Sequence, residues 1–322
     1  MTPLRVAALA LVLLVAAASW VLTCAAWRAD RVIAGVAPLE PRRFPPLALV
    51  TLGTGGAVEN PARLGPATAV ARGPRVVLVD AGRGVAESLR RAKVPTRQPD
   101  AVYLTSLLPE NTDGLDDLLA TGWLDGRTTA LRVVGPPGTA ALAAGIEAAH
   151  AAGLAARGAA LGLPAEGARL LPVEVAEGFS EEHEGLVVRA GALPGGPLPA
   201  LAWRFEADGR SAVVAGAGWA PEALVAFARG ADVLVHEAAY VPTPEEARAA
   251  ELEVDPARLE REARLHTSID AVGALAQRAG VRELVLVRLR PPPVYDVQIT
   301  SRVGDTFSGR VVVAEDGDEI RP

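Results

Sequence analysis

Short runs of β-branched residues bounded by glycine and proline alternate with alanine- and leucine-rich stretches from Leu47 onward. The short runs are typical of buried strands, and the longer stretches are typical of helices. The predicted strands are residues 47–53, 67–72, 75–80, 100–105, 131–134, 171–175, 185–189, 201–206, 211–214, 232–236, 283–287 and 309–314. The predicted helices are residues 84–92, 113–121, a long helix that opens at 138–139, 221–229, 245–264 and 269–279. This alternation, without a dividing linker, predicts one layered α/β domain over residues 47–322.

Three local signals sharpen this pattern. Asp208-Gly209 is a strong hairpin turn signal and predicts that the strands on either side of it pair. Thr139 is predicted to cap the long alanine-rich helix, because threonine is favoured at that position. The stretch 245–264 mixes charges of both signs, which predicts a solvated helical face.

The N-terminus has a different pattern. Val6 to Trp27 is a run of 22 residues without a charge. At about 1.5 Å per residue, such a helix spans the hydrocarbon core of a bilayer, which is about 30 Å thick. A cleavable signal usually has an apolar region of about 7–15 residues, so we predict a retained signal anchor over residues 1–28. A cleaved signal is the alternative, and a buried core helix fits the terminal position poorly. Residues 29–46 are rich in proline towards their end and are predicted to be a stiff tether.

The positive charges on the two sides of the apolar run are equal in number and do not decide the orientation of the anchor. The α-amine and Arg5 precede the apolar run, and Arg28 and Arg31 come after it. The very short N-terminal tail favours export of the domain on the C-terminal side of the anchor. We therefore predict a single-pass membrane protein with its domain on the periplasmic or extracellular side.

Composition excludes several classes of protein. The chain has 322 residues, of which 22% are charged and 50% hydrophobic, and these fractions are those of a folded globular protein. Its single cysteine excludes a disulfide framework and a thiolate zinc cluster. The net charge of −6 gives no broad basic face, so nucleic acid is not an expected partner.

Candidate chemistry lies in the loops at the ends of the predicted strands, where layered α/β proteins place their ligand sites. These loops are residues 52–56 (LGTGG), 80–82 (DAG), 105–115, 216–218 (GAG), 236–238 (HEA), 266–268 (HTS) and 288. Each of these motifs is weak alone, and their order and spacing carry the information.

Taken in order, these segments resemble the metallo-β-lactamase fold, within it the ribonuclease Z and arylsulfatase-like branch. The resemblance runs from Leu47 to Gly317 and includes TDGLDDLLATGW at 112–123, LRVVGPPGT at 131–139 and VRELVLVRLRP at 281–291. It implies a four-layer αβ/βα sandwich. It also implies a two-metal hydrolytic site, in which zinc or a similar pair of divalent ions is held by imidazoles and carboxylates.

The chain departs from the family at the metal ligands. Relatives carry His-x-His-x-Asp-His before the TDGL segment, and this chain reads Ser106-Leu107-Leu108-Pro109-Glu110-Asn111. Three imidazoles are thus replaced by a hydroxyl, an isobutyl group and an amide, and the aspartate by Glu110.

The remaining ligand positions show the same trend. By the resemblance, the next histidine falls near Gly195, the bridging aspartate at Ala217 and the last histidine at Arg288. Loss of groups that merely support metal ligands commonly costs 10–100-fold in affinity, so loss of most ligands should abolish binding. We therefore predict that no metal cofactor is bound.

Another part of the family's pocket remains. His236, Glu237 and His266 match motifs that in ribonuclease-like relatives form a hydrogen-bonded group near the scissile phosphate. They predict either a binding or acid–base pair, in which Glu237 orients an imidazole, or satisfied polar residues that only hold loops.

The cation at Arg288 predicts an anion-binding preference. The alternative is that it pairs with Asp80, Glu110 or Asp113, since close carboxylates without a cation repel each other.

The sequence therefore predicts a membrane-tethered, catalytically inactive homologue that binds a small anionic ligand or a partner protein. One alternative is an active hydrolase of phosphodiesters or of sulfate or carboxylic esters. Another is a metal-free hydrolase that uses His236, Glu237 and His266.

Overall fold

The computed structural model describes residues 3–58, 60–216, 218–291 and 296–322. The chain divides into two units, Met1–Leu39 and Glu40–Pro322. Each unit is described by itself.

The first unit is dominated by one helix, α1 (Pro3–Val36). Its segment Leu11–Ala29 is long and apolar enough to serve as a membrane anchor or as a signal sequence. Large apolar side chains such as Leu14 and Trp20 are about two-thirds exposed, as expected of a helix that lacks a protein core around it.

The predicted tether is shorter than expected. The helix continues to Val36 and the first strand begins at Phe44, so residues 29–36 and 44–46 are wrongly assigned to a tether. The helix runs on because the chain has no proline between Pro3 and Pro38 to interrupt it.

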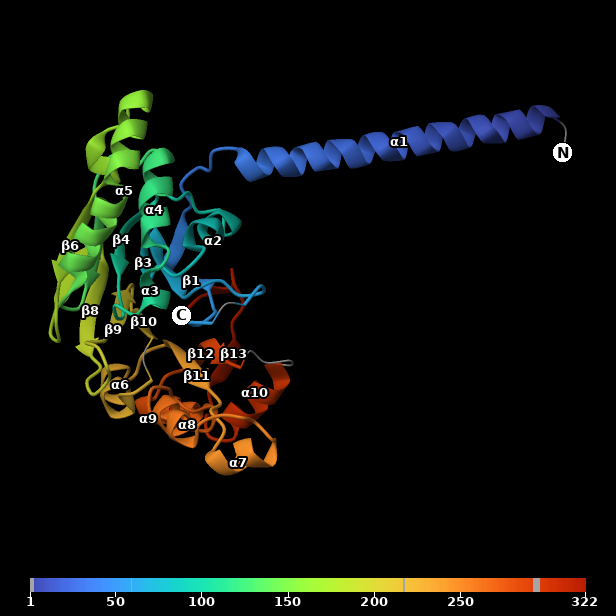
Figure 1. Ribbon diagram of the computed structural model, residues 1–322. Coiled ribbons are helices and arrows are strands. Elements are labelled where there is room, and N and C mark those ends of the chain that lie inside the picture. The colour runs from blue at the N-terminus through green and yellow to red at the C-terminus, as the bar shows by residue number, and fades with distance from the viewer. Residues whose placement is uncertain (1–2, 59, 217, 292–295) are drawn as a thin grey trace. The chain divides into compact units, whose positions relative to one another are not determined.

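Over the described residues, the second unit contains two seven-stranded sheets (Figure 1). The first has the order β14-β1-β2-β3-β4-β5-β6 and the second the order β13-β12-β11-β10-β9-β8-β7. The strands of the first sheet are β1 (Phe44–Gly53), β2 (Ala67–Gly73), β3 (Arg75–Val79), β4 (Pro99–Tyr103), β5 (Leu131–Gly135), β6 (Leu170–Glu174) and β14 (Glu319–Ile320). Those of the second are β7 (Ser180–His183), β8 (Leu186–Ala192), β9 (Leu201–Ala207), β10 (Arg210–Ala215), β11 (Val233–Ala239), β12 (Glu283–Arg290) and β13 (Arg310–Val313).

Helices cover the outer faces of both sheets (Figure 1). The helices of this unit are α2 (Val85–Arg91), α3 (Pro109–Thr112), α4 (Leu115–Leu124), α5 (Thr139–Leu161), the 3₁₀ turn η1 (Ala165–Ala168), α6 (Pro221–Phe227), α7 (Pro244–Ala249), α8 (Pro256–Ala263), α9 (Ile269–Ala279) and α10 (Asp296–Gly304). Helices α2, α4 and α5 share a buried cluster with the first sheet, and α6, α9 and α10 share another with the second.

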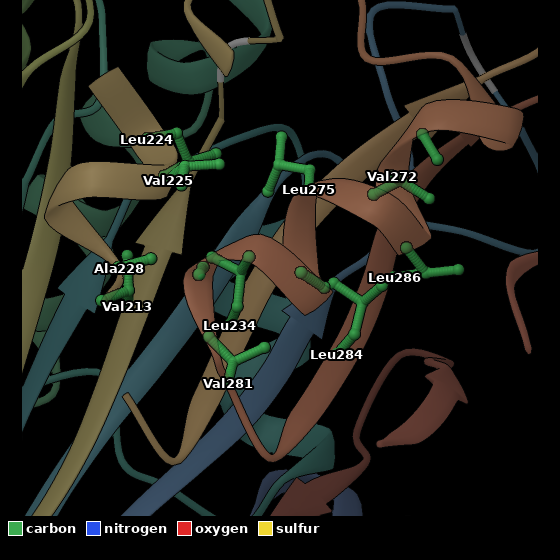
Figure 2. Close-up of a cluster of buried hydrophobic side chains, with 14 of the residues drawn as sticks. Val213, Leu224, Val225, Ala228, Leu234, Val272, Leu275, Val281, Leu284 and Leu286 are labelled. Atoms are coloured by element: carbon green, nitrogen blue, oxygen red, sulfur yellow. The ribbon is translucent and has the colours of Figure 1, made fainter. Parts of the chain in front are cut away.

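Strand β12 shows how the layers are separated. Leu284 and Leu286 belong to the cluster beneath α6 and α9 (Figure 2), whereas Val285 and Val287 belong to the cluster between the two sheets. Side chains alternate between the two faces of a strand, so β12 supplies both layers at once. The four-layer αβ/βα sandwich is therefore confirmed.

Two predictions about helices are wrong. The predicted helix 245–264 is two helices, because Thr243 and Asp255 each cap a new one and a proline comes directly after each cap. Thr139 is not a cap: Gly138, at a φ of 103°, holds that position, and the Thr139 hydroxyl donates to the Pro136 carbonyl instead.

Candidate functional site

The carboxyl ends of strands from both sheets meet at a cavity of about 350 Å³. Strands β3 and β4 run parallel in the first sheet, and β10, β11 and β12 run parallel in the second. Parallel strands deliver their succeeding loops to the same edge, which is where ligand sites form in such folds. Glu110, Glu237, His266 and Arg288 all line this cavity.

An ion pair joins the two sheets at the base of the site. Nη2 of Arg288, on β12, lies 2.5 Å from Oδ2 of Asp80, which comes directly after β3. Nη1 of Arg288 donates to the Asn111 amide oxygen at 2.8 Å. The side chains of Arg288 and Asp80 are only 10% and 1% exposed, so both charges are held out of water.

A β-bulge aims Arg288 at this position. Glu237 of β11 pairs with Val287, but Ala239 pairs with Arg290, so β12 has one residue more than its partner here. Arg288 takes up the extra residue with a φ of 53°, and its backbone N–H donates to the Thr54 carbonyl at 2.7 Å. A bulge re-aims a side chain.

Asp80 is held by a second set of donors. The backbone N–H of Thr105 donates to Oδ1 at 2.7 Å, and the Thr105 hydroxyl donates to Oδ2 at 2.8 Å. Burial raises the pKa of Asp80 above its ordinary value, and the positive charge of Arg288 opposes that rise. The ionised carboxylate therefore depends on its guanidinium partner.

Ser106 and Asn111, the residues expected at two of the family's histidine positions, are hydrogen-bonded to each other. The Asn111 amide donates to the Ser106 hydroxyl at 2.8 Å and to the Thr105 hydroxyl at 3.2 Å. Both Ser106 and Asn111 are almost fully buried. Ser106, Asn111, Asp80 and Arg288 thus form one continuous polar network.

Glu237 and His266 form a hydrogen-bonded pair on the cavity wall. Nδ1 of His266 lies 2.8 Å from Oε2 of Glu237, which leaves Nε2 as the ring's other polar atom. The hydrogen bond to Glu237 raises the pKa of His266 above its ordinary value. The Glu237 side chain is 6% exposed and the His266 side chain 25% exposed.

His236 lies apart from this pair. Its Nδ1 is 3.1 Å from the Ala215 carbonyl and its Nε2 is 2.8 Å from the Thr267 hydroxyl. Burial lowers the pKa of His236, so the ring is neutral. His236 does not line the cavity. Of the predicted group of His236, Glu237 and His266, only Glu237 and His266 lie together on the cavity wall.

Of the three predicted acidic partners of Arg288, only one contacts it. Asp80 contacts its guanidinium, whereas Glu110 lies on the cavity wall and Asp113 is exposed outside the cavity lining. The pairing alternative is therefore realised through Asp80.

The donor set on the described residues does not fit a pair of zinc ions. Among them, no three histidine, cysteine, aspartate or glutamate side chains converge on one point. The buried Asp80 carboxylate, which could otherwise serve as a ligand, is bonded to Arg288. Gly195, near the expected position of a further histidine ligand, does not line the cavity, although Pro197 does. Ala217, at the expected position of the bridging aspartate, lies outside the described residues.

Sequence reasoning missed several residues of the site. Thr105 binds Asp80 through two atoms, and Trp219 and Leu265 form apolar parts of the cavity. Thr105 directly precedes Ser106 and ends a predicted buried strand, which was a usable signal. Trp219 and Leu265 carry no pattern that separates them from core residues.

Comparisons with known proteins agree with this fold. No family model matches the chain. Ribonuclease Z from Mycobacterium bovis is 31% identical over 279 residues, covering 84% of this chain and 96% of that protein. Ribonuclease Z from Mycobacterium sp. (strain KMS) is 32% identical over 282 residues, covering 84% and 94%. The chain belongs to the ribonuclease Z family.

Solved structures show the same fold at lower identity. The metallo-beta-lactamase fold protein YhfI from Bacillus subtilis aligns with a TM-score of 0.65 and 17% identity, covering 86% of this chain and 99% of that one. The short form of human tRNase Z aligns with a TM-score of 0.62 and 19% identity, covering 85% and 98%. Zn²⁺-bound PqqB from Methylobacterium extorquens aligns with a TM-score of 0.60 and 16% identity, covering 85% and 100%. This ribonuclease Z family member is thus a metallo-β-lactamase-fold chain of the hydrolase family.

Arg288→Met should lower the free energy of unfolding by about 3–5 kcal/mol, because it leaves the buried Asp80 carboxylate without its cation. The double variant Asp80→Asn, Arg288→Met removes both charges and should lose less than the single variant. Urea unfolding of the full-length chain in one detergent measures both. A double variant at least as unstable as Arg288→Met would contradict the ion pair.

The Glu237–His266 pair should make stability depend on pH. The raised pKa of His266 means that the folded chain keeps the proton to a higher pH than the unfolded chain, whose imidazole titrates near pH 6.5. The stabilisation is therefore full below about pH 6.5 and is lost as the pH rises through the folded-state pKa. Urea unfolding between pH 6 and 9 should show the gap between the native chain and Glu237→Gln narrowing with rising pH. A gap that is constant or widens would rule out this linkage.

Proposed function

We propose that this ribonuclease Z family member is a membrane-tethered, metal-independent binding protein whose pocket takes a small anionic ligand. The observation that carries the proposal is the Arg288–Asp80 ion pair, which places a permanent cation where the family's metal pair is expected. On this account the chain is a catalytically inactive homologue.

Electrostatics supports the loss of metal. Two unit charges of like sign 4 Å apart repel by about 4 kcal/mol at an effective dielectric constant near 20, and a divalent ion doubles that figure. The ligands that would offset this repulsion are replaced by Ser106, Leu108 and Asn111. A guanidinium needs no such ligands, because it carries its charge permanently and donates one N–H to the carboxylate and another to the amide beside it.

The two charged pairs support binding of an anion. Arg288 is paired with Asp80, and His266, when protonated, is paired with Glu237. Arg63 and Arg290 also line the cavity and add positive charge to its wall. Nε2 of His266 is the donor best placed for an acceptor oxygen, because Nδ1 is held by Glu237. Charge-assisted donors of this kind bind oxyanions more strongly than neutral ones do.

The second candidate is hydrolysis of phosphodiesters or of sulfate or carboxylic esters, as the family membership suggests. The presence of Glu237 and His266 on the cavity wall favours it, since a positioned imidazole can donate a proton to a leaving group. A metal-free version relies on the same pair and lacks an activated nucleophile on the described residues. Loss of measured turnover in His266→Ala, with metal absent, would be needed to support that version.

Metal content separates the two candidates. Full-length protein purified from cells grown with added zinc, iron and manganese should contain less than about 0.1 equivalents of each metal by mass spectrometry, because first-row divalent ions need several nitrogen or oxygen ligands. A matched ribonuclease Z prepared in the same way serves as the control. Two bound equivalents in this chain would overturn the proposal in favour of the hydrolase.

The membrane tether is proposed on the length and apolar character of α1. We propose that the helix is retained as a single-pass anchor with the domain exported. A reporter that is active only outside the cytoplasm, fused after Pro322, should be active and should sediment with membranes. An inactive reporter would place the domain in the cytoplasm and contradict export. A fusion that is soluble and has lost about its first 28 residues would indicate a cleaved signal.

A further inference from the structure

We propose that the ligand of this cavity is an amphiphilic monoanion, with an oxyanion head bound at the base and an alkyl or aryl body held in the mouth. This inference rests on the proposed metal-free binding function and names the chemical class of its ligand. Its basis is the distribution of polar and apolar residues around the cavity.

The base of the cavity is polar and buried. The Arg288 side chain is 10% exposed and the Glu237 side chain 6% exposed, and His266 stands beside them. Asp80 accepts from Arg288, and Oε2 of Glu237 accepts from His266. Oε1 of Glu237 is buried and has no hydrogen-bond partner among the described residues. This base therefore suits a head group that carries both an acceptor oxygen for the His266 ring and an O–H that donates to Glu237.

The mouth of the cavity is apolar and open. Val58 is 65% exposed and Leu265 is 38% exposed, and both line the cavity. Pro61 and Trp219 add further apolar surface to the lining. Single exposed apolar residues are ordinary, but a group of them around one concave site indicates a binding surface.

Size and charge narrow the class. About 350 Å³ falls within the range of small-molecule sites and exceeds what an inorganic oxyanion fills. Arg63, Arg290 and Glu110 also line the cavity, so its wall carries charges of both signs. The O–H of a singly charged oxyanion can donate to a carboxylate, whereas a dianion offers no such donor. An oxyanion head with one negative charge and an apolar body matches both ends of the cavity.

Affinity should therefore rise with the length of the apolar body. Isothermal titration of the full-length chain in phosphatidylcholine nanodiscs, with metal content measured on the same sample, compares hexyl phosphate with methyl phosphate. At about pH 6, where phosphate monoesters carry mainly one charge, hexyl phosphate should bind at least ten-fold more tightly. Hexanol, which lacks the oxyanion, should bind at least ten-fold more weakly than hexyl phosphate.

Variants test each end of the cavity separately. His266→Gln should weaken binding of hexyl phosphate at least ten-fold, because it removes a charged donor at the base. Leu265→Ser should cut the preference for hexyl over methyl phosphate at least three-fold, because it removes apolar surface at the mouth. The matched control is Leu171→Ser, a 52% exposed leucine outside the cavity, which should leave both affinities unchanged.

Equal affinity of the metal-free protein for hexyl and methyl phosphate would overturn this inference alone. No binding of either would count against both the inference and the proposed anion binding. Bound metal whose removal by a chelator abolishes the binding would overturn the proposed function instead. The source of the ligand is tested by adding phosphatidic acid to the nanodiscs. Weaker apparent binding of hexyl phosphate then indicates a bilayer lipid, and unchanged binding indicates a soluble amphiphile, either of which supports the class.

Discussion

The contact between Arg288 and Asp80 joins the two sheets of the sandwich beside the cavity that Arg288 lines. Asp80 comes directly after a strand of the first sheet and Arg288 sits in a bulge of the second, so the pair fixes the two carboxyl-end edges against each other. Each partner is further held, Asp80 by Thr105 and Arg288 by Asn111. Buried charges are tolerated only when they are paired and hydrogen-bonded in this way.

This constraint explains the rest of the site. A guanidinium binds its carboxylate through directed N–H groups and carries its charge permanently, so it gives the pocket a fixed cation without recruiting one from solution. In the same network the Asn111 amide donates to the Ser106 hydroxyl while its oxygen accepts from Arg288. Glu237 and His266 form a second pair on the cavity wall.

Much of the fold was predictable from the sequence, because most of its strands and helices have a distinct local pattern. The helix 269–279 and the hairpin at Asp208-Gly209 were predicted at or near their observed bounds. Elements with little local pattern were missed. Helix α3 has four residues and β14 has two, which is too short for a periodicity to show, and β7 (SEEH) consists of polar residues.

The site was predictable in composition but not in arrangement. The motif order predicted which residues stand at the family's ligand positions, and this stays a prediction. Asp80 was among the expected partners of Arg288, and the structure shows that pairing. The bulge that selects Asp80 over Glu110 and Asp113 depends on the pairing of β11 with β12, which no local pattern encodes. The separation of His236 from Glu237 and His266 likewise results from alternation on β11 and from contacts with Ala215 and Thr267 that come from distant parts of the chain.

The most direct test is anomalous X-ray diffraction from crystals of the full-length chain grown with excess Zn²⁺, recorded at the zinc edge. The account predicts no anomalous peak beside Asp80, with the Arg288 guanidinium bonded to that carboxylate and to Asn111. A zinc peak at that position, with Arg288 displaced into solvent, would contradict it.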